Sequence, residues 1–204
     1  MRKLVVSVYN ILIKVFFPKV AQTKGTGTPI TLKYLFFQKI LGFNRKVYWP
    51  VHFTSIITGY KNIHAGIDVS PGYMPGCYIQ GIGKISIGDY TQISANVGII
   101  TANHDIYDNS RHIVKSVDIG KYCWIGMNVM ILPGVKLGDN IIVGAGSVVT
   151  KSYEEGNCIL AGNPAKIIKK LNKDEFVHYK NKYEYKGFIK AKDFDNYRKR
   201  KLNF

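Results

Sequence analysis

A period of six residues dominates the middle of this chain, from Val117 to Lys151. An amphipathic helix would space its apolar residues by three and four positions, and a half-buried strand would alternate every two. A period of six instead indicates a short strand, a turn and another short strand on a new face, repeated as a solenoid of parallel β coils. The bulky aliphatic residues that mark the period are Ile119, Ile125, Ile131, Leu137, Val143 and Val149.

The same phase continues upstream and breaks twice. The first break falls at Pro75 and Gly81, around the segment SPGYMPG, and the second spans residues 101–116. In a solenoid such a break is a loop that leaves the coil, and loops of this kind often form the binding face. Because the second break begins with Asn-His-Asp, we expect it to carry a functional residue. The upstream positions in phase are Ile57, Ile63, Val69, Ile87, Ile93 and Ile99.

The net charge of +16 is unevenly distributed along the chain. Residues 1–50 carry +9 without a single acidic residue, residues 51–165 carry −1, and residues 166–204 carry +8. The coil is therefore nearly neutral and both flanks are basic. This pattern predicts an anionic partner at the flanks, such as membrane headgroups, an acidic glycan or the phosphates of a ligand. A merely solubilising surface is the alternative.

The first segment has an apolar body from Leu4 to Phe17 between basic residues. It has no small-residue cleavage site, so we do not expect a signal peptide. It is shorter than a membrane-spanning helix and contains Lys14. We expect an amphipathic helix that ends at Pro18 and either packs on the protein or lies in a membrane interface. Its narrow polar stripe would contain Lys3, Ser7, Asn10 and Lys14.

Local signals predict two more helices. One runs from Ile30 to Leu41 and stops at Gly42. The other begins at Asn163, an N-cap type of residue followed by proline. The tail from Asp174 mixes aromatic and basic residues, and without a recognised module we expect a solvated, partly helical appendage and no nucleic-acid partner. The helix after Asn163 would carry Lys166, Lys169 and Lys170.

Neither the cysteines nor the histidines form a recognisable framework. Cys77, Cys123 and Cys158 are far apart in the sequence and form no CxxC motif. They therefore do not indicate an oxidising compartment. The five histidines share no ligand spacing with cysteines or carboxylates. We therefore expect no metal site.

Several motifs together resemble the hexapeptide-repeat acyltransferases. They are VDIG, CWIG, LGDN and GAGSVVTK, followed by AGNPAKII, with a looped-out histidine before them. The resemblance covers residues 57–171 and is closest to the maltose, galactoside and xenobiotic acetyltransferases and to the O-acetyltransferases of capsule and O-antigen synthesis. It implies an all-β solenoid, a left-handed parallel β-helix that assembles as a homotrimer and uses acetyl-CoA. Parallel β crossovers are nearly always right-handed, so the expected hand comes from the resemblance alone.

The resemblance also implies roles for individual residues. His104 falls where the family has its catalytic histidine, with Asp105 in place of the usual proline, and His112 is expected to be structural. A neutral imidazole can remove the proton of an attacking hydroxyl. Tyr78 and Gln80 are weak candidates for binding the acceptor. The positions that match the family's coenzyme contacts are Trp124, Gly126, Met127, Gly144, Ala145, Thr150, Lys151, Lys166 and Lys169. Gly126 and Gly144 would let the ligand approach closely.

These features predict a basic helical segment over residues 1–50, an acyltransferase β-helix over 51–160, and a C-terminal loop, helix and basic tail over 161–204. We expect an acetyl-CoA-dependent O-acetyltransferase that modifies a carbohydrate, either a surface polysaccharide or its precursor. The expected location is cytoplasmic, and the membrane alternative for the first segment would place the protein at the inner face of the membrane. Serine O-acetylation, N-acetylation of an amino-sugar nucleotide and a non-enzymatic β-helical assembly subunit remain alternatives.

Overall fold

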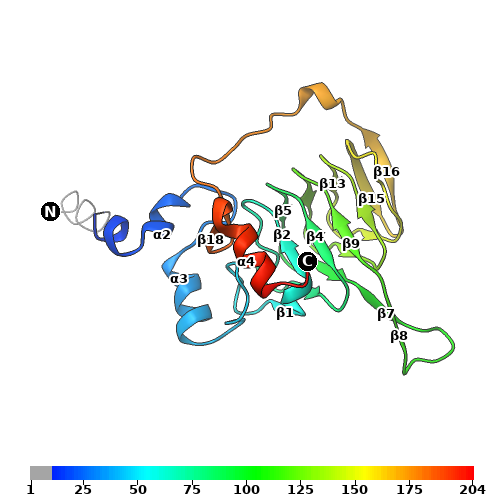
Figure 1. Ribbon diagram of the computed structural model, residues 1–204. Helices are drawn as coiled ribbons and strands as arrows, with labels where there is room; N and C mark the ends of the chain where they lie inside the picture. The colour runs from blue at the N-terminus through cyan, green and yellow to red at the C-terminus, as the bar shows by residue number, and fades with distance from the viewer. Residues whose placement is uncertain (1–10) are drawn as a thin grey trace.

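The middle of the chain winds into a β-helix of three parallel sheets in the computed structural model, which describes residues 11–204 (Figure 1). The first sheet contains β1 (Ile56–Thr58), β3 (Tyr78–Gln80), β6 (Gly98–Ile100), β11 (Met130–Ile131) and β14 (Val148–Val149). The second contains β2 (Ile63–Ala65), β4 (Ile85–Ile87), β9 (Val117–Ile119) and β12 (Lys136–Leu137). The third contains β5 (Gln92–Ile93), β10 (Trp124–Ile125), β13 (Ile142–Val143), β15 (Cys158–Gly162) and β16 (Ala165–Lys170).

The predicted period of six is confirmed by the strand register. Ile125 pairs with Val143, and Ile131 pairs with Val149, so one full coil takes three hexapeptides. These side chains point inward and are at most 1% exposed. Stacked aliphatic columns of this kind remove apolar area from water at every coil, which is the main stabilising contribution.

The predicted phase is confirmed for Ile57 and Ile87, but it is wrong by two residues for Ile63. Ile63 pairs with Ile85, and it is Ala65 that lies against Ile87. The first cause is the SPGYMPG loop, residues 70–76, which lies between the first and second coils. The second is a wider corner in each of these coils, which in the first contains the short 3-10 helix η2 (Tyr60–Asn62). A hexapeptide count cannot foresee corners of unequal length.

The second break is a β-hairpin, as the predicted looped-out segment required. β7 (Ala102–His104) pairs antiparallel with β8 (His112–Val114), and Figure 1 shows the hairpin projecting from the coils. The chain then rejoins the coil at β9 (Val117–Ile119), which pairs with β4.

The N-terminal flank is helical, in agreement with the sequence. Residues 11–16 are helical, and Pro18 starts the next short helix, α2 (Pro18–Gln22). The second predicted helix is present as α3 (Leu32–Leu35) continued by the π-helical turn η1 (Phe36–Ile40). Lys3, Ser7 and Asn10 of the predicted polar stripe lie outside the described residues. Among residues 11–204, no helix is both long and apolar enough to cross a membrane.

The predicted helix after Asn163 is wrong. The chain turns there and forms β16, which pairs antiparallel with β15. The last parallel strand of a β-helix has an unpaired edge, and pairing that edge satisfies more backbone groups than an isolated helix would. Ala165 is buried and its carbonyl accepts a hydrogen bond from the hydroxyl of Tyr153 (2.5 Å), so tertiary contacts override the local N-cap signal.

The tail is packed against the protein, which corrects the expectation of a solvated appendage. After η3 (Lys173–Glu175), it forms β17 (Tyr185–Lys186), β18 (Ile189–Lys190), η4 (Ala191–Asp193) and α4 (Phe194–Lys201). Phe194 is 1% exposed and contacts Tyr48, at a ring-centroid distance of 5.4 Å. The amide of Phe188 donates to the carbonyl of Tyr48 (2.9 Å). The two basic flanks therefore lie side by side.

Replacing Gly138 should destabilise the coil, because there is no room for a side chain between coils. An added Cβ would lie 2.3 Å from the carbonyl oxygen of Glu154. Gly138→Ala is expected to lower the free energy of unfolding by about 1–3 kcal/mol. The matched control is Gly144→Ala, whose Cβ would lie 3.3 Å from that of Ala161; it should stay within about 0.5 kcal/mol of wild type. Urea unfolding measures both, and equal losses would contradict the explanation.

His64 should make stability depend on pH. Burial, followed by the charges of Lys186 and Arg198, lowers its pKa from 6.5 to about 4. The unfolded chain therefore takes up this proton first, and stability falls as pH drops from about 6.5 towards 4. Because the ring is partly exposed, we expect a loss of only about 1 kcal/mol between pH 7 and pH 5. Urea unfolding of wild type and His64→Gln measures it, and the variant should lose less on acidification.

Candidate active site

His104 is the last paired residue of β7 before the loop of the projecting hairpin, opposite His112. The two residues are cross-strand partners, and their ring centroids are 4.4 Å apart. Nδ1 of His104 lies 2.5 Å from the carbonyl oxygen of Asn109. Because a carbonyl oxygen can only accept, Nδ1 carries the proton in this hydrogen bond, and Nε2 keeps its lone pair. An imidazole held in this tautomer can accept a proton at Nε2.

Asp105 organises the loop rather than the imidazole. Its Oδ1 accepts hydrogen bonds from the amides of Tyr107 (2.8 Å) and Asp108 (3.2 Å). Its own amide donates to the carbonyl of Arg111 (2.9 Å), a bond that proline could not make. The aspartate thus supplies a hydrogen-bonded turn that brings the carbonyl of Asn109 to His104.

Gln80 ties the base of the hairpin to the coil below it. Its side-chain Oε1 accepts from the amides of Thr101 (3.2 Å) and Ala102 (3.0 Å), and its carbonyl accepts from the hydroxyl of Thr101 (2.6 Å). Gln80 therefore helps to fix the direction in which β7 leaves the coil. The sequence predicted that Gln80 binds the acceptor, and it gave no signal for these hydrogen bonds to the hairpin.

Trp124, Gly126 and Met127 lie together where the third sheet turns towards the first. Trp124 is 55% exposed on β10, and its Nε1 donates to the hydroxyl of Ser94 (3.4 Å). Met127 is also exposed. Ala145 follows on the next coil at the same corner, where the amide of Gly146 donates to the carbonyl of Met127 (2.8 Å). Four of the predicted coenzyme positions are therefore stacked: Gly126, Met127, Gly144 and Ala145.

The glycine at position 126 has a structural explanation of its own. A Cβ there would lie 2.7 Å from the carbonyl oxygen of Val143 and 2.8 Å from the amide nitrogen of Ala145. Stacking of the coils alone thus requires glycine, whether or not a ligand approaches. The predicted coenzyme role of Gly126 stays a prediction.

The remaining predicted coenzyme residues lie at two further places. Thr150 and Lys151 are exposed directly after β14, at the same edge of the β-helix from which the hairpin leaves after β6. Lys166 and Lys169 lie on β16, where Lys166 pairs with Ala161. Ala161 is close to Gly144 of the coil before it. Lys166 therefore extends the corner that holds Met127 and Ala145.

The first sheet lies between two corners of the β-helix. One holds Met127 and Ala145, and the other holds Thr150 and Lys151. Tyr78 points outward from it on β3 and is 40% exposed, in register with Gly98 on β6. His104 stands apart: within residues 11–204, no described hydrogen bond or ring contact joins it to Trp124 or to the lysines. One chain thus presents a histidine on an arm and a separate stacked corner.

The sequence could not have revealed the partner of His104. A main-chain carbonyl is the same for every residue type, so Asn109 carried no signal. The anchoring role of Gln80 was hidden for a different reason, since it depends on the register between two coils.

Comparison with known proteins defines the class. Residues 116–151 match the family model described as bacterial transferase hexapeptide (six repeats). The chain is 34% identical over 143 residues to the galactoside O-acetyltransferase of Escherichia coli (strain K12), covering 68% of this chain and 66% of the relative. It is 40% identical over 108 residues to a putative lipopolysaccharide biosynthesis O-acetyltransferase of the same organism, covering 47% of this chain and 55% of that protein.

A solved structure of a galactoside acetyltransferase in complex with coenzyme A is also similar. It superposes with a TM-score of 0.56 at 30% identity, covering 67% of this chain and 68% of that one. The fold is thus the left-handed parallel β-helix of hexapeptide repeats, as the resemblance implied. The chain belongs to the hexapeptide-repeat acetyltransferase family. It spans between half and two thirds of the length of the two curated relatives.

Gln80→Leu should loosen the hairpin, because it removes the acceptor of two backbone amides. Each lost hydrogen bond of a partly buried donor costs about 1 kcal/mol. We therefore expect tryptic cleavage after Arg111, in the exposed hairpin, to become about tenfold faster in limited proteolysis. Gln80→Glu keeps an acceptor oxygen and should remain close to wild type. Equal cleavage of wild type and Gln80→Leu would show that the side chain does not hold the hairpin.

Proposed function

We propose that this protein transfers an acetyl group from acetyl-CoA to a hydroxyl of a carbohydrate. The observation that carries the proposal is the imidazole of His104, held by Asn109 on an arm that projects from a hexapeptide coil. The similarity to galactoside O-acetyltransferase supports the same reaction class.

In this mechanism His104 is the general base. Nε2 accepts the proton of the sugar hydroxyl as its oxygen attacks the carbonyl carbon of the thioester. The tetrahedral intermediate then expels the coenzyme A thiolate, and the imidazolium gives its proton to this thiolate. The hydrogen bond from Nδ1 to the carbonyl of Asn109 keeps the ring oriented between these steps.

Acetyl-CoA would lie along the first sheet, between the two corners. Trp124, with its exposed ring, is proposed to flank the pantetheine arm. The stacked corner of Met127 and Ala145 offers main-chain groups beside it. Lys166 and Lys169 would meet the nucleotide phosphates as point charges, without the bidentate geometry of arginine. Thr150 and Lys151 are proposed as the remaining coenzyme contacts.

A homotrimer would complete the site. His104 projects on its arm away from the stacked corner of its own chain, so a neighbouring copy is proposed to supply the coenzyme corner that faces it. The acceptor is proposed to be a surface polysaccharide or its precursor. The similarity to a putative lipopolysaccharide biosynthesis O-acetyltransferase supports this class of acceptor, and Tyr78 is proposed to contact it.

His104→Ala should lose about 100-fold or more in kcat, because it removes the base. Coenzyme A binding, measured by titration calorimetry, should be largely retained. The assay is thiol release from acetyl-CoA with a panel of galactosides, glucosides and surface oligosaccharides.

The matched control is His112→Phe, which keeps a ring against His104 but cannot accept a proton. It should retain kcat within about tenfold of wild type. If His112→Phe lost activity and His104→Ala kept it, the base would be assigned to the wrong histidine. If the wild type bound coenzyme A but acetylated none of the acceptors in the panel, the carbohydrate assignment would be wrong.

A further inference from the structure

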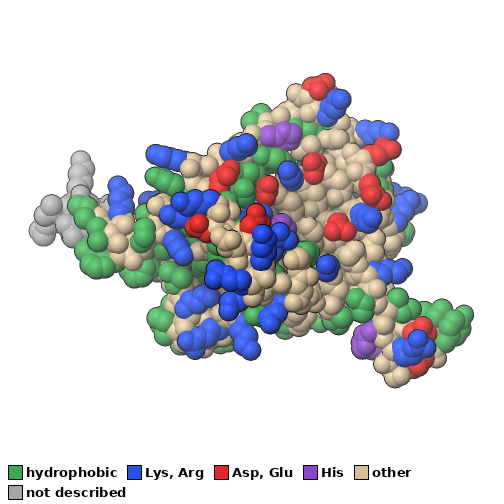
Figure 2. Space-filling view, in the orientation of Figure 1, with side chains coloured by type: hydrophobic (Ala, Val, Ile, Leu, Met, Phe, Trp, Pro, Cys, Tyr) green, Lys and Arg blue, Asp and Glu red, His purple; other side chains and the backbone are tan. Residues whose placement is uncertain are grey.

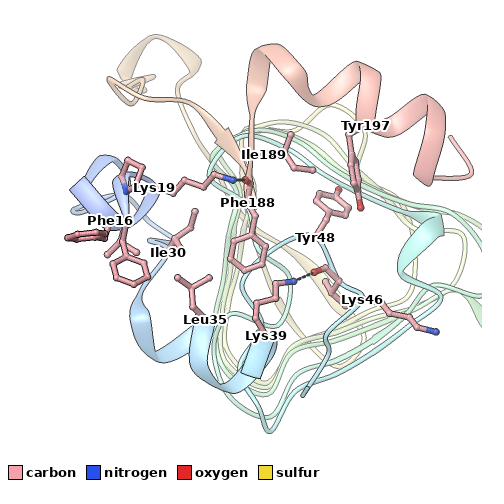
Figure 3. A pocket seen from close by; sticks show the side chains of 14 residues that line it. Phe16, Lys19, Ile30, Leu35, Lys39, Lys46, Tyr48, Phe188, Ile189 and Tyr197 are labelled. Carbon is pink, nitrogen blue, oxygen red and sulfur yellow. Dashed lines mark hydrogen bonds between the residues drawn. The ribbon is translucent and has the colours of Figure 1, made fainter. Parts of the chain in front are cut away.

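A cavity of about 570 Å³ lies away from the candidate active site, between the N-terminal helices and the C-terminal tail. Figure 3 shows that its walls come from both flanks: Phe16, Ile30 and Leu35 on one side, Phe188 and Ile189 on the other. Most of these walls are apolar. A volume of this size is within the range of pockets that hold small molecules.

Two ammonium groups lie at this apolar cavity. Nζ of Lys39 donates to the carbonyls of Arg45 (3.1 Å) and Val47 (3.4 Å) and lies 4.7 Å from the ring centroid of Phe188. Nζ of Lys19 donates to the carbonyl of Phe188 (2.8 Å). Burial, and then the charge of Arg45, lowers the pKa of Lys39. An anion beside it would relieve this cost.

The chain does not supply that anion from nearby. Residues 1–50 contain no Asp or Glu at all. Over residues 11–204, the one salt bridge between side chains joins Arg198 to Asp195. Lys19 and Lys39 therefore have only neutral carbonyl and ring partners among the described residues. An anion in contact with these ammonium groups would therefore be a bound ligand rather than a side chain of residues 11–204.

The surface around the cavity is apolar as well as basic. Val15 and Phe16 are about two-thirds exposed, and Ile40 is 71% exposed. Figure 2 shows hydrophobic side chains over the N-terminal helices among Lys and Arg side chains. Exposed apolar side chains beside cations suit the boundary between lipid headgroups and acyl chains.

We propose that this cavity binds an anionic membrane lipid, with an acyl chain among Phe16, Leu35 and Phe188 and the lipid phosphate on Lys19 and Lys39. The site holds the protein at an anionic bilayer surface. It is independent of acetyl transfer, because neither lysine belongs to the proposed catalytic or coenzyme residues.

Vesicle flotation of the full chain tests the proposal. We expect binding to vesicles of phosphatidylcholine with 30 mol% phosphatidylglycerol and at least about tenfold weaker binding to phosphatidylcholine alone. Lys19→Gln with Lys39→Gln should weaken binding to the anionic vesicles about 25-fold, at about fivefold per lysine near an anionic surface. The matched control, Lys136→Gln with Lys173→Gln, removes two exposed lysines outside the cavity and should change binding less than twofold.

Leu35→Trp tests the apolar half of the site without changing charge. It fills the cavity and should weaken binding about tenfold, with an unchanged circular dichroism spectrum as evidence of folding. Calorimetry with dodecyl phosphate below its micelle concentration should show binding, and inorganic phosphate should not.

Four outcomes would overturn the proposal. If the wild-type protein does not float with the anionic vesicles, the proposed lipid ligand is wrong. A control pair that loses as much binding as the cavity pair removes the assigned site. Leu35→Trp that binds like wild type, or inorganic phosphate that binds as well as dodecyl phosphate, removes the acyl-chain cavity.

Discussion

The structure depends on the stacking of one coil directly on the next. Each coil donates backbone hydrogen bonds to its neighbour, as Gly126 does to Val143 (2.9 Å), while the inward aliphatic residues form continuous columns. The spacing between coils is fixed by these bonds at about 4.8 Å. Corners therefore lie above one another, and residues a full coil apart in sequence, such as Met127 and Ala145, become neighbours.

A rigid column of this kind makes a good support for a projecting arm. The hairpin that holds His104 is attached at its base by Gln80 on one coil, and after its second strand the chain rejoins the same column at Val117. Its own loop, organised by Asp105, orients the imidazole through a main-chain carbonyl. The chemistry is thus carried by an element outside the coil, and the coil decides where that element points.

The basic flanks acquire a shared meaning only in three dimensions. The sequence predicted an anionic partner for each flank, but it could not show that the flanks meet. The tail returns beside the first coil, where Phe194 is buried against Tyr48 and Lys19 reaches the carbonyl of Phe188. Positive charge from both ends is concentrated in this way next to an apolar cavity, while the coil remains close to neutral.

The sequence by itself determined the β-helix, its inward residues from Ile87 onward and the place where the chain leaves the coil, because a period of six has no other simple structural solution. Its hand came only from the resemblance to a known family. Tertiary structure decided the register of the first two coils, the strand after Pro164 and the partner of His104. Each depends on contacts between distant segments: corner lengths, a free strand edge and a main-chain carbonyl, none of which a local pattern encodes.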